Sequence, residues 1–274
     1  MVRTVAFQGE RGAYSEEAVF QRYGPVPVLP CRTLPEVFDA VEAGVATEGL
    51  VPIENSLAGS INESYDLLLQ RSLTISGETI LRVRHCLLAL PGSKLGELKR
   101  VYSHPQALAQ CGDFVQKHGL EAVAVYDTAG GARMLVDVQS KQACAIASRR
   151  AAELYGLEIL AEGIETNAHN YTRFYVITKE PPPPPAPGRR SKTVLVFSTA
   201  HRPGTLYWCL GAFAYRNINL LKLESRPIHG RPWEYLFYAD IEGHSSESHV
   251  KEALKDLETK TVMVRVLGSF EASS

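Results

Sequence analysis

The five residues from Asn170 to Phe174 read Asn-Tyr-Thr-Arg-Phe and place an amide, a hydroxyl and a guanidinium at the start of a strand-like run that ends at Thr178. Strand starts and the loops that feed them are positions where a rigid scaffold can present polar groups to a ligand. Thr-Arg-Phe alone is a short motif, and a Thr and an Arg that solubilise a strand edge would also explain it. The functional interpretation therefore depends on the other polar segments of the chain.

One such segment, from Gly9 to Ser15, reads G-x-x-G-x-x-S and lies between an expected strand (2–7) and an expected helix (16–22). Glycines allow backbone N–H groups to approach an anion, and a helix N-terminus attracts negative charge. The segment lacks the Gly-Lys-Ser/Thr of a P-loop and the G-x-G-x-x-G of a dinucleotide-binding fold. A small-carboxylate site and a plain strand-to-helix turn are the two interpretations left.

Further polar loops follow the next strand-like runs. Glu54 to Ser60 is rich in donors and acceptors, and Ser103 precedes a helix as an N-cap or a ligand donor. Gln106 and Gln110 lie one helical turn apart on one face of that helix, and the Asp127–Ala132 loop is another such junction. Polar loops at successive strand ends predict one face of a cleft.

Strands that alternate with helices predict the α/β class, with parallel or mixed sheets and flanking helices. The proline-rich segment predicts an extended linker, which divides the chain into a catalytic region (1–180), a linker (181–191) and a C-terminal unit (192–274). The C-terminal pattern is β-α-β-β-α-β, the ferredoxin-like order. Its strands are expected over 192–199, 218–228, 233–241 and 262–267, and its helices over 203–215 and 246–257. Open sheet edges in so small a unit favour pairing with a second copy.

Composition narrows the class of protein. The 274 residues are 45% hydrophobic and 22% charged with a net charge of -1, so no basic field indicates nucleic acid or a membrane surface. No apolar run approaches the ~18 residues that a membrane span needs, and the first residues do not resemble a signal peptide. Five cysteines without a C-x-x-C pair favour reduced thiols and a cytoplasmic protein. His244 and His249 are five apart and no H-E-x-x-H occurs, so neither a metal nor another cofactor is expected.

Taken in order, four segments resemble those of prephenate dehydratases: Gly9-x-x-Gly-x-x-Ser15, Pro52-Ile-Glu-Asn-Ser-x-x-Gly-Ser60, Ser103-His-Pro-Gln-Ala-Leu108 and Asn170-x-Thr-Arg-Phe174. The C-terminal unit is similar to an ACT domain in Gly204-x-Leu206, Asn217-Ile-Asn-Leu220 and Glu224-Ser-Arg-Pro227. The resemblance implies a monofunctional enzyme that converts prephenate to phenylpyruvate, water and carbon dioxide in phenylalanine biosynthesis. It also implies two α/β lobes with a cleft like that of periplasmic binding proteins, and a chain that returns to the first lobe near residues 170–180.

The resemblance assigns roles residue by residue. Thr172 is the expected catalytic residue, and the expected substrate-binding residues are Asn55, Ser56, Ser103, Gln106, Thr128, Asn170, Arg173 and Phe174. L-Phenylalanine is the expected effector, with feedback inhibition as its expected sign, in a homodimer or homotetramer formed through the ACT domains. The expected effector site consists of Gly204, Leu206, Asn219, Leu220, Glu224, Ser225, Arg226 and Pro227.

The chemistry needs little from the protein, because aromatisation of the ring drives the loss of the hydroxyl and the carboxylate. A Thr hydroxyl is too weak an acid to be a free proton source, so we hypothesise that Thr172 donates a hydrogen bond to the departing hydroxyl. Arg173 could pair with a substrate carboxylate or form a structural ion pair. Glu54 could be a general acid if it were buried, although a solvated loop Glu is the commoner case.

Two other functions fit the same motifs. Arogenate dehydratase acts on a substrate with an amino group in place of the keto oxygen, and the motifs do not separate it from prephenate dehydratase. A non-catalytic sensor of small carboxylates would also use a two-lobed cleft and an ACT domain. The Thr172 hydroxyl argues against the sensor, since a protein that only binds needs no donor aimed at a leaving group.

Overall fold

The structure is a computed structural model that describes residues 2–186, 188–228 and 230–273. Packing divides the chain into two compact units, residues 1–65 with 79–174, and residues 66–78 with 175–274. Three elements contain the points where the chain passes from one unit to the other: α3 (Asn62–Gln70), β5 (Thr74–Arg82) and β11 (Tyr171–Thr178). None of the helices in the described part of the chain is long and apolar enough to span a membrane.

The first lobe of the first unit contains a sheet of order β11-β3-β1-β2, in which β1 (Val5–Gln8) is parallel to both β2 (Val28–Cys31) and β3 (Glu48–Asn55). A short strand, β4 (Gly59–Ser60), turns back antiparallel to β3. Two helices belong to this lobe, α1 (Tyr14–Tyr23) and α2 (Leu34–Glu42). Thr33 accepts a hydrogen bond from Glu36 N at 3.4 Å and so caps α2.

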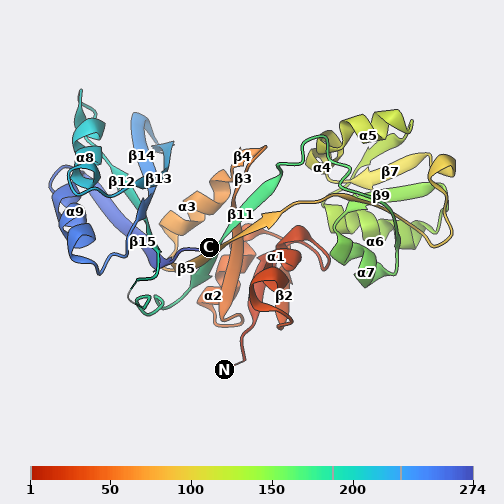
Figure 1. The fold of residues 1–274 in the computed structure, drawn as a ribbon, viewed down its shortest axis with the longest axis horizontal. Coiled ribbons are helices and arrows are strands. Elements are labelled where there is room, and N and C mark those ends of the chain that lie inside the picture. The colour runs from red at the N-terminus through yellow and green to blue at the C-terminus, as the bar shows by residue number, and fades with distance from the viewer. Residues whose placement is uncertain (1, 187, 229, 274) are drawn as a thin grey trace. The chain divides into compact units, whose positions relative to one another are not determined.

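The second lobe of the same unit is built on a five-stranded mixed sheet of order β10-β6-β9-β7-β8. Its strands are β6 (Cys86–Ala89), β7 (Arg100–Ser103), β8 (Glu121–Ala124), β9 (Ala143–Ala147) and β10 (Glu158–Glu162). Alternate residues of β6 and β9 point to opposite faces, as the period of a strand requires. One face packs against α6 (Thr128–Val138) and α7 (Arg149–Tyr155), and the other against α4 (Pro105–Gln110) and α5 (Gly112–Lys117), with a 3-10 turn at Leu95–Glu97 (Figure 1).

Two crossover segments, residues 83–85 and 163–170, connect the lobes. Backbone hydrogen bonds hold them together, from Val83 N to Asn170 O at 2.8 Å and from Ile164 N to His85 O at 3.2 Å. The carboxylate of Glu165 accepts a further bond from His85 N at 2.9 Å. The crossovers are therefore a paired structure, and the polar side chains on them have fixed positions. The first crossover also separates β5 from β6 at Arg84 and His85.

The second unit contains a C-terminal β-α-β-β-α-β pattern whose sheet order is β13-β14-β12-β15 with all neighbours antiparallel. Its elements are β12 (Ser191–Ser198), α8 (Thr205–Ala214), β13 (Leu220–Ile228), β14 (Arg231–Glu242), α9 (Ser248–Glu258) and β15 (Met263–Glu271). Figure 1 shows α8 and α9 on one side of this sheet. The core of the unit includes Phe197, Phe213 and Leu257. The predicted fold class, α/β lobes with a ferredoxin-like unit, is confirmed.

The C-terminal sheet gains a fifth strand, because β5 runs parallel to β15 with Ile75 opposite Gly268. Thr74 Oγ1 donates to Leu267 O at 3.1 Å beside that pair. The described residues 181–186, within the predicted linker, form no helix or strand.

Candidate active site

A cavity of about 160 Å³ in the first unit is lined by side chains from both lobes and the crossovers. Its residues include Tyr14 and Asn55 of the first lobe, Val83 and His85 of a crossover, His104, Gln106, Gln110 and Thr128 of the second lobe, and Thr172 and Phe174 of β11. A neighbouring cavity of about 300 Å³ shares Tyr14, Ser15, His104 and Thr128 with it. Through these shared residues the two cavities form one cleft, which is the candidate active site.

Thr172 accepts a hydrogen bond from Asn55, and this fixes what its hydroxyl can do. The side-chain oxygen of Asn55 accepts from the backbone N–H groups of Leu57 (3.1 Å) and Ala58 (3.0 Å), which identifies the other end of the amide as Nδ2. Asn55 Nδ2 then donates to Thr172 Oγ1 at 3.1 Å. Because the Thr172 oxygen is the acceptor of this bond, its own proton is available to a group in the cavity.

The same amide begins a chain of hydrogen bonds that reaches the second lobe. Asn55 Nδ2 also donates to Asn170 Oδ1 at 2.8 Å, so Asn170 must present Nδ2 to its next neighbour. That neighbour is Gln110, whose Oε1 accepts from Asn170 Nδ2 at 2.9 Å. Gln110 Oε1 lies 2.8 Å from His85 Nε2, and His85 Nδ1 lies 2.8 Å from the hydroxyl of Tyr14.

Five of the nine residues with a predicted catalytic or substrate-binding role line the cavity: Asn55, Gln106, Thr128, Thr172 and Phe174. Asn170 is fully buried and acts through the chain of amides just described. Ser103, Ser56 and Arg173 are not among the described residues that line it.

Of the two roles predicted for Ser103, N-cap or ligand donor, the N-cap is wrong. His104 is the N-cap of α4 and accepts from Gln106 N at 3.2 Å. The fully buried hydroxyl of Ser103 donates to Ile146 O at 2.6 Å, across to the neighbouring strand β9. A buried hydroxyl needs an acceptor, and the strand supplies it.

Ser56 and Arg173 form contacts that stabilise the segments next to the site. The hydroxyl of Ser56 donates to His169 O at 2.7 Å and accepts from Tyr171 N at 2.9 Å, which anchors the segment before Thr172. Arg173 forms an ion pair with Glu54, with Nη2 to Oε2 at 3.1 Å. Of the two interpretations of Arg173, the structure shows the ion pair, and it engages the Glu54 carboxylate that could have been a general acid.

The start of α1 borders both cavities through Tyr14 and Ser15. Its N-cap is Ala13, which has no side chain that can cap the helix. Backbone N–H groups at an uncapped helix start attract anions. The start of α6 differs, because the carboxylate of Asp127 caps it by accepting from Gly130 N, and also accepts from Glu10 N at 3.3 Å.

Sequence reasoning missed Tyr14, His85 and His104 as cavity residues. Tyr14 lies inside the Gly9–Ser15 motif, so its position next to a polar loop was a usable signal. His85 stands in a crossover, with no pattern in the sequence to mark it. Burial lowers the pKa of His85 below its usual value, and burial raises the pKa of Tyr14 well above its usual range. At neutral pH both side chains are therefore uncharged.

The thiols do not serve as nucleophiles here. All five cysteines are free and buried, and burial raises the pKa of both Cys111 and Cys144 to about 12. A thiol is reactive as its thiolate, which these surroundings disfavour. Within the described ranges, no cluster of three or more His, Cys, Asp or Glu side chains is arranged to hold a metal ion.

In the second unit, the predicted effector residues fall into two groups. Gly204 and Leu206 line a cavity of about 340 Å³ together with aromatic residues such as Tyr207 and Trp233. The remaining ones lie on or just before β13, outside the described lining of that cavity. Arg226 Nη2 pairs with Asp66 Oδ2 at 3.1 Å, which ties β13 to α3.

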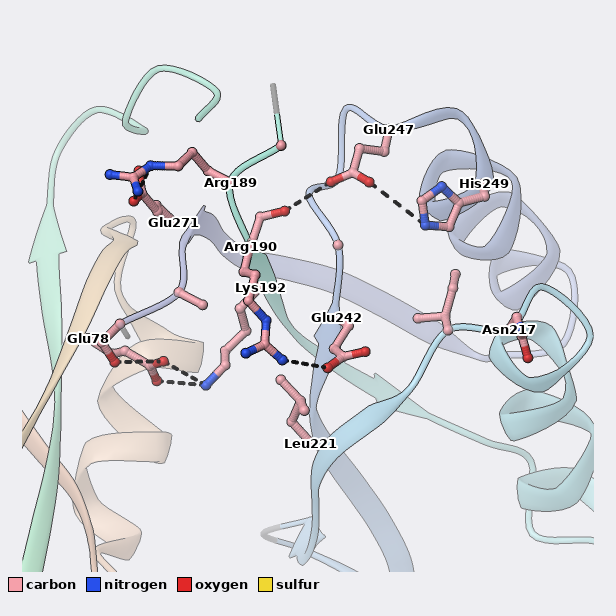
Figure 2. Close-up of a pocket in the computed structure, with 16 residues that line it drawn as sticks. Glu78, Arg189, Arg190, Lys192, Asn217, Leu221, Glu242, Glu247, His249 and Glu271 are labelled. Carbon is pink, nitrogen blue, oxygen red and sulfur yellow. Dashed lines mark hydrogen bonds and ion pairs between the residues drawn. The ribbon is translucent and has the colours of Figure 1, made fainter. Parts of the chain in front are cut away.

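A larger cavity of about 660 Å³ in the second unit is lined by charged side chains that neutralise one another (Figure 2). The ammonium of Lys192 lies 2.8 Å from both oxygens of Glu78, and both residues are buried. The other pairs are Arg189 with Glu271 (3.1 Å), Arg190 with Glu242 (3.9 Å) and His249 with Glu247 (3.8 Å). Each of the three cations among these residues, Arg189, Arg190 and Lys192, therefore lies beside a carboxylate.

Comparison with known proteins agrees with this architecture. The family model "Prephenate dehydratase" matches residues 5–182, and the model "ACT domain" matches residues 193–259. The "Arogenate dehydratase/prephenate dehydratase 2, chloroplastic" of Arabidopsis thaliana is 45% identical over 97% of this chain and 72% of its own length.

Two solved structures are similar over nearly the whole chain. A prephenate dehydratase from Arthrobacter aurescens in complex with L-Phe has a TM-score of 0.88 and 33% identity, over 98% of this chain and 89% of its own. A protein titled "GqqA- a novel type of quorum quenching acylases" has a TM-score of 0.92 and 39% identity, over 99% and 98% of the two chains.

Proposed function

The chain belongs to the prephenate dehydratase family, and from this we propose that it converts prephenate to phenylpyruvate, water and carbon dioxide. The observation that carries the proposal is the direction of the hydrogen bond between Asn55 and Thr172. Asn55 donates, so the Thr172 hydroxyl can donate in turn to a substrate oxygen in the cavity. A hydroxyl that accepts one hydrogen bond becomes a better donor of the next, and burial strengthens both.

The reaction needs one donor at one place. The bond from the ring carbon to its carboxylate breaks, and its electron pair enters the ring as the aromatic system forms. The ring carbon–hydroxyl bond breaks at the opposite position, and the hydroxyl takes up one proton and leaves as water. Thr172 stabilises the developing negative charge on that oxygen, and a preorganised donor of this kind supplies about 3 kcal/mol. The proton that completes the water comes from solvent.

Prephenate carries two carboxylates, and under this proposal the described lining would bind them without a cationic side chain. None of the described residues that line the cavity around Thr172 is a lysine or arginine. The uncapped start of α1 and the amide of Gln106 supply N–H donors instead. The same lining contains no carboxylate among its described residues, which suits a keto group better than an ammonium.

Arogenate is the second candidate substrate, and one observation favours it. The Asp127 carboxylate lines the neighbouring cavity, where it could accept a hydrogen bond from a substrate ammonium. The Arabidopsis thaliana relative carries both activities in its name. Asp127 already accepts from Gly130 N and Glu10 N as a helix cap, so we place arogenate second.

We further propose that L-phenylalanine inhibits the enzyme by binding in the ACT domain. The similar structure from Arthrobacter aurescens is a complex with L-Phe, and Gly204 and Leu206 line a cavity here. The predicted effector residues on and before β13 lie outside that cavity's described lining, which supports a site completed by a second copy in a homodimer or homotetramer. A cytoplasmic location remains our proposal from composition.

The test compares the wild-type protein with Thr172→Val and Thr172→Ser on prephenate and on arogenate, with and without L-phenylalanine. We expect turnover of prephenate, a loss of about a hundredfold or more in kcat for Thr172→Val because the donor is removed, and substantial recovery in Thr172→Ser. Circular dichroism of each variant checks folding.

Near-normal turnover by a folded Thr172→Val protein would contradict the role of the hydroxyl. A higher kcat/KM for arogenate would make the second candidate the function. Acylase activity without turnover of either ring substrate would place the protein with the similar structure that is described as an acylase. Saturable binding without any turnover would indicate a sensor.

A further inference from the structure

His85 is a buried titratable residue that contacts the chain of amides behind Thr172 and has no assigned role. Only about 2% of its surface is exposed, and both ring nitrogens are engaged, Nε2 by Gln110 and Nδ1 by Tyr14. Its backbone belongs to the crossover between the lobes, where His85 N donates to Glu165 and His85 O accepts from Ile164. It therefore connects the crossover between the lobes with the polar side chains of the site.

The protonation of each ring nitrogen follows from hydrogen-bond direction. The backbone N–H groups of Leu57 and Ala58 fix the orientation of Asn55, and Asn55 Nδ2 fixes that of Asn170. Asn170 must then donate to Gln110, so the Gln110 atom that faces His85 is the oxygen Oε1. An oxygen can only accept, and His85 Nε2 must therefore carry a proton.

The other nitrogen is left as an acceptor in the neutral ring. Tyr14 OH lies 2.8 Å from Nδ1 and 3.2 Å from Arg84 O, and the shorter contact suits a phenol that donates to a bare nitrogen. Tyr14 and His85 both line the cavity, so this contact brings the start of α1 to the crossover. Tyr14 therefore donates to His85, His85 donates to Gln110, and each of these hydrogen bonds has one donor and one acceptor.

We propose that His85, as the neutral ring with its proton on Nε2, is a positioning residue for the dehydration, and that it holds the amides of Gln110, Asn170 and Asn55 in the orientation that makes Thr172 a donor. This inference rests on the proposed function. If the Gln110 amide were flipped, its NH2 group would face the NH2 group of Asn170, and neither could accept a hydrogen bond. Asn170 would then have to flip too, and its NH2 group would face that of Asn55. Asn55 could then no longer both donate to Thr172 and satisfy the turn after β3.

The surroundings of the ring favour the neutral form. Burial is the largest influence and lowers the pKa of His85, while the hydrogen bond with Gln110 and the Glu165 carboxylate oppose it. Burial also raises the pKa of Cys86 to about 11 and of Cys111 to about 12, so these thiols bring no charge. The groups that face the Tyr14–His85 pair from the elements around it are Glu17, Cys86, Cys111 and Glu165.

The pH dependence follows from that direction. Because the pKa of folded His85 lies below the usual histidine value, the ring stays neutral through neutral pH and gains a proton only in more acidic solution. The proton would go to Nδ1, which could then no longer accept from Tyr14. The charged ring would keep its Nε2–H toward Gln110, so the acid effect arises at Tyr14, which lines the cavity and would lose its acceptor. We therefore expect kcat to be constant around neutral pH and to fall on the acidic side, below the range of an ordinary histidine.

The test uses the full-length protein with three substitutions. His85→Leu removes both ring nitrogens. His85→Gln keeps a donor close to the position of Nε2 but cannot titrate. His118→Gln is the control, because His118 follows the C-terminal end of α5 and lies outside the described lining of the cleft. On whichever ring substrate the wild type turns over, we expect His85→Leu to lose about a hundredfold in kcat with a smaller change in KM. His85→Gln should recover most of that loss and lack the fall in kcat at acidic pH.

A second measurement needs no substrate. Proton–nitrogen correlation spectra of histidine-labelled protein distinguish a protonated ring nitrogen from a bare one, and His85→Gln identifies the signals that belong to His85 among the 8 histidines. We expect a protonated Nε2 and a bare Nδ1 at neutral pH. A proton on Nδ1 at neutral pH, or a folded His85→Leu protein with the kcat and pH profile of the wild type, would overturn the inference.

The two proposals can fail separately. A wild type that turns over neither prephenate nor arogenate refutes the proposed function and with it the role of His85 in dehydration, whatever the spectra show. A wild type that is active on either substrate, with kcat unaffected by His85→Leu, refutes the positioning role alone.

Discussion

At the scale of single residues, the site depends on one amide that is oriented by the backbone. Asn55 stands at the end of β3, in a turn where the N–H groups of Leu57 and Ala58 donate to its side-chain oxygen. Folding of the turn therefore decides which end of the amide meets Thr172. A Thr hydroxyl has no preferred direction of its own, and it becomes a directed donor because its neighbour can only donate.

Asn55→Asp tests this argument with almost no change of shape. The new carboxylate would still accept from Leu57 N and Ala58 N, so the turn should survive. It would accept from Thr172 instead of donating to it, and it would face the Asn170 oxygen without a proton between them. We expect kcat to fall about a hundredfold or more with little change in folding, measured by steady-state kinetics and circular dichroism.

Leu57→Ala is the matched control, because it changes an exposed side chain of the same turn and keeps the backbone donor. Its kcat should stay within a few-fold of the wild type. Wild-type kcat in a folded Asn55→Asp protein would show that the direction of the hydrogen bond to Thr172 is unimportant.

Part of this site could be predicted from polar residue types and their positions next to the expected strands and helices. Asn55, Gln106, Thr128 and Thr172 could be identified because each is a polar residue close to the end or start of a strand or at the start of a helix. Ser103 fits the same pattern, but its hydroxyl donates a hydrogen bond to Ile146 O on β9. A sequence does not show which acceptor a buried hydroxyl will bond. His85 could not be identified, because its role arises from contacts with residues 25 and 71 positions away.

At the scale of elements, the attachment of β5 to the C-terminal sheet depends on a glycine. A Cβ added at Gly268 would overlap the carbonyl oxygen of Ile75 and lie 2.7 Å from its Cβ. These two residues are paired across β15 and β5. Gly268 therefore allows two strands to approach more closely than any side chain would permit.

Gly268→Ala should destabilise the protein by about 1–3 kcal/mol, because the added methyl group must push β5 and β15 apart in a packed region. Chemical denaturation followed by circular dichroism measures this. Gly112→Ala is the control, since a Cβ at that position on α5 meets nothing within 4 Å and should change the free energy of unfolding little. Equal stability of the two variants would mean that the close approach at Gly268 does not matter.

Most helices and strands could be predicted from the sequence, but the pairing of the strands was harder to predict. Alternating strands and helices indicated the α/β class, and the last part of the chain followed the ferredoxin-like order from its apolar pattern. The pairing of β5 with β15 joins positions 75 and 268, and the only local sign of it is a glycine in a strand. Strand pairing over such a separation is set by tertiary packing, which local preferences do not contain.

At the scale of the whole molecule, the division by packing differs from the division by sequence. The proline-rich segment suggests a boundary near residues 181–191, and the two family models also meet there. Packing nevertheless groups residues 66–78 with 175–274. Within that unit, the guanidinium of Arg265 donates to the carbonyl oxygens of Leu69 and Arg71, both at 2.8 Å.

A chain that ends at residue 180 should therefore not be a well-folded catalytic domain. It would lose Lys192, which lies 2.8 Å from both carboxylate oxygens of the buried Glu78, and it would expose the fully buried Ile75. Loss of the cation beside a buried carboxylate costs about 3–5 kcal/mol, and β5 would be left with an unpaired edge toward its former partner. We expect the shortened chain to aggregate or to unfold at a clearly lower temperature than the full chain.

Size-exclusion chromatography and thermal unfolding compare the two chains, and a shortened chain that also carries Glu78→Gln and Ile75→Thr separates the causes. If the buried carboxylate and the exposed apolar strand are responsible, these two changes should restore part of the solubility. A shortened chain that melts at the temperature of the full protein would show that residues 66–78 do not need the C-terminal strands. The C-terminal strands would then form a separable module, whereas the packing of this unit predicts that these strands also support the fold of residues 66–78.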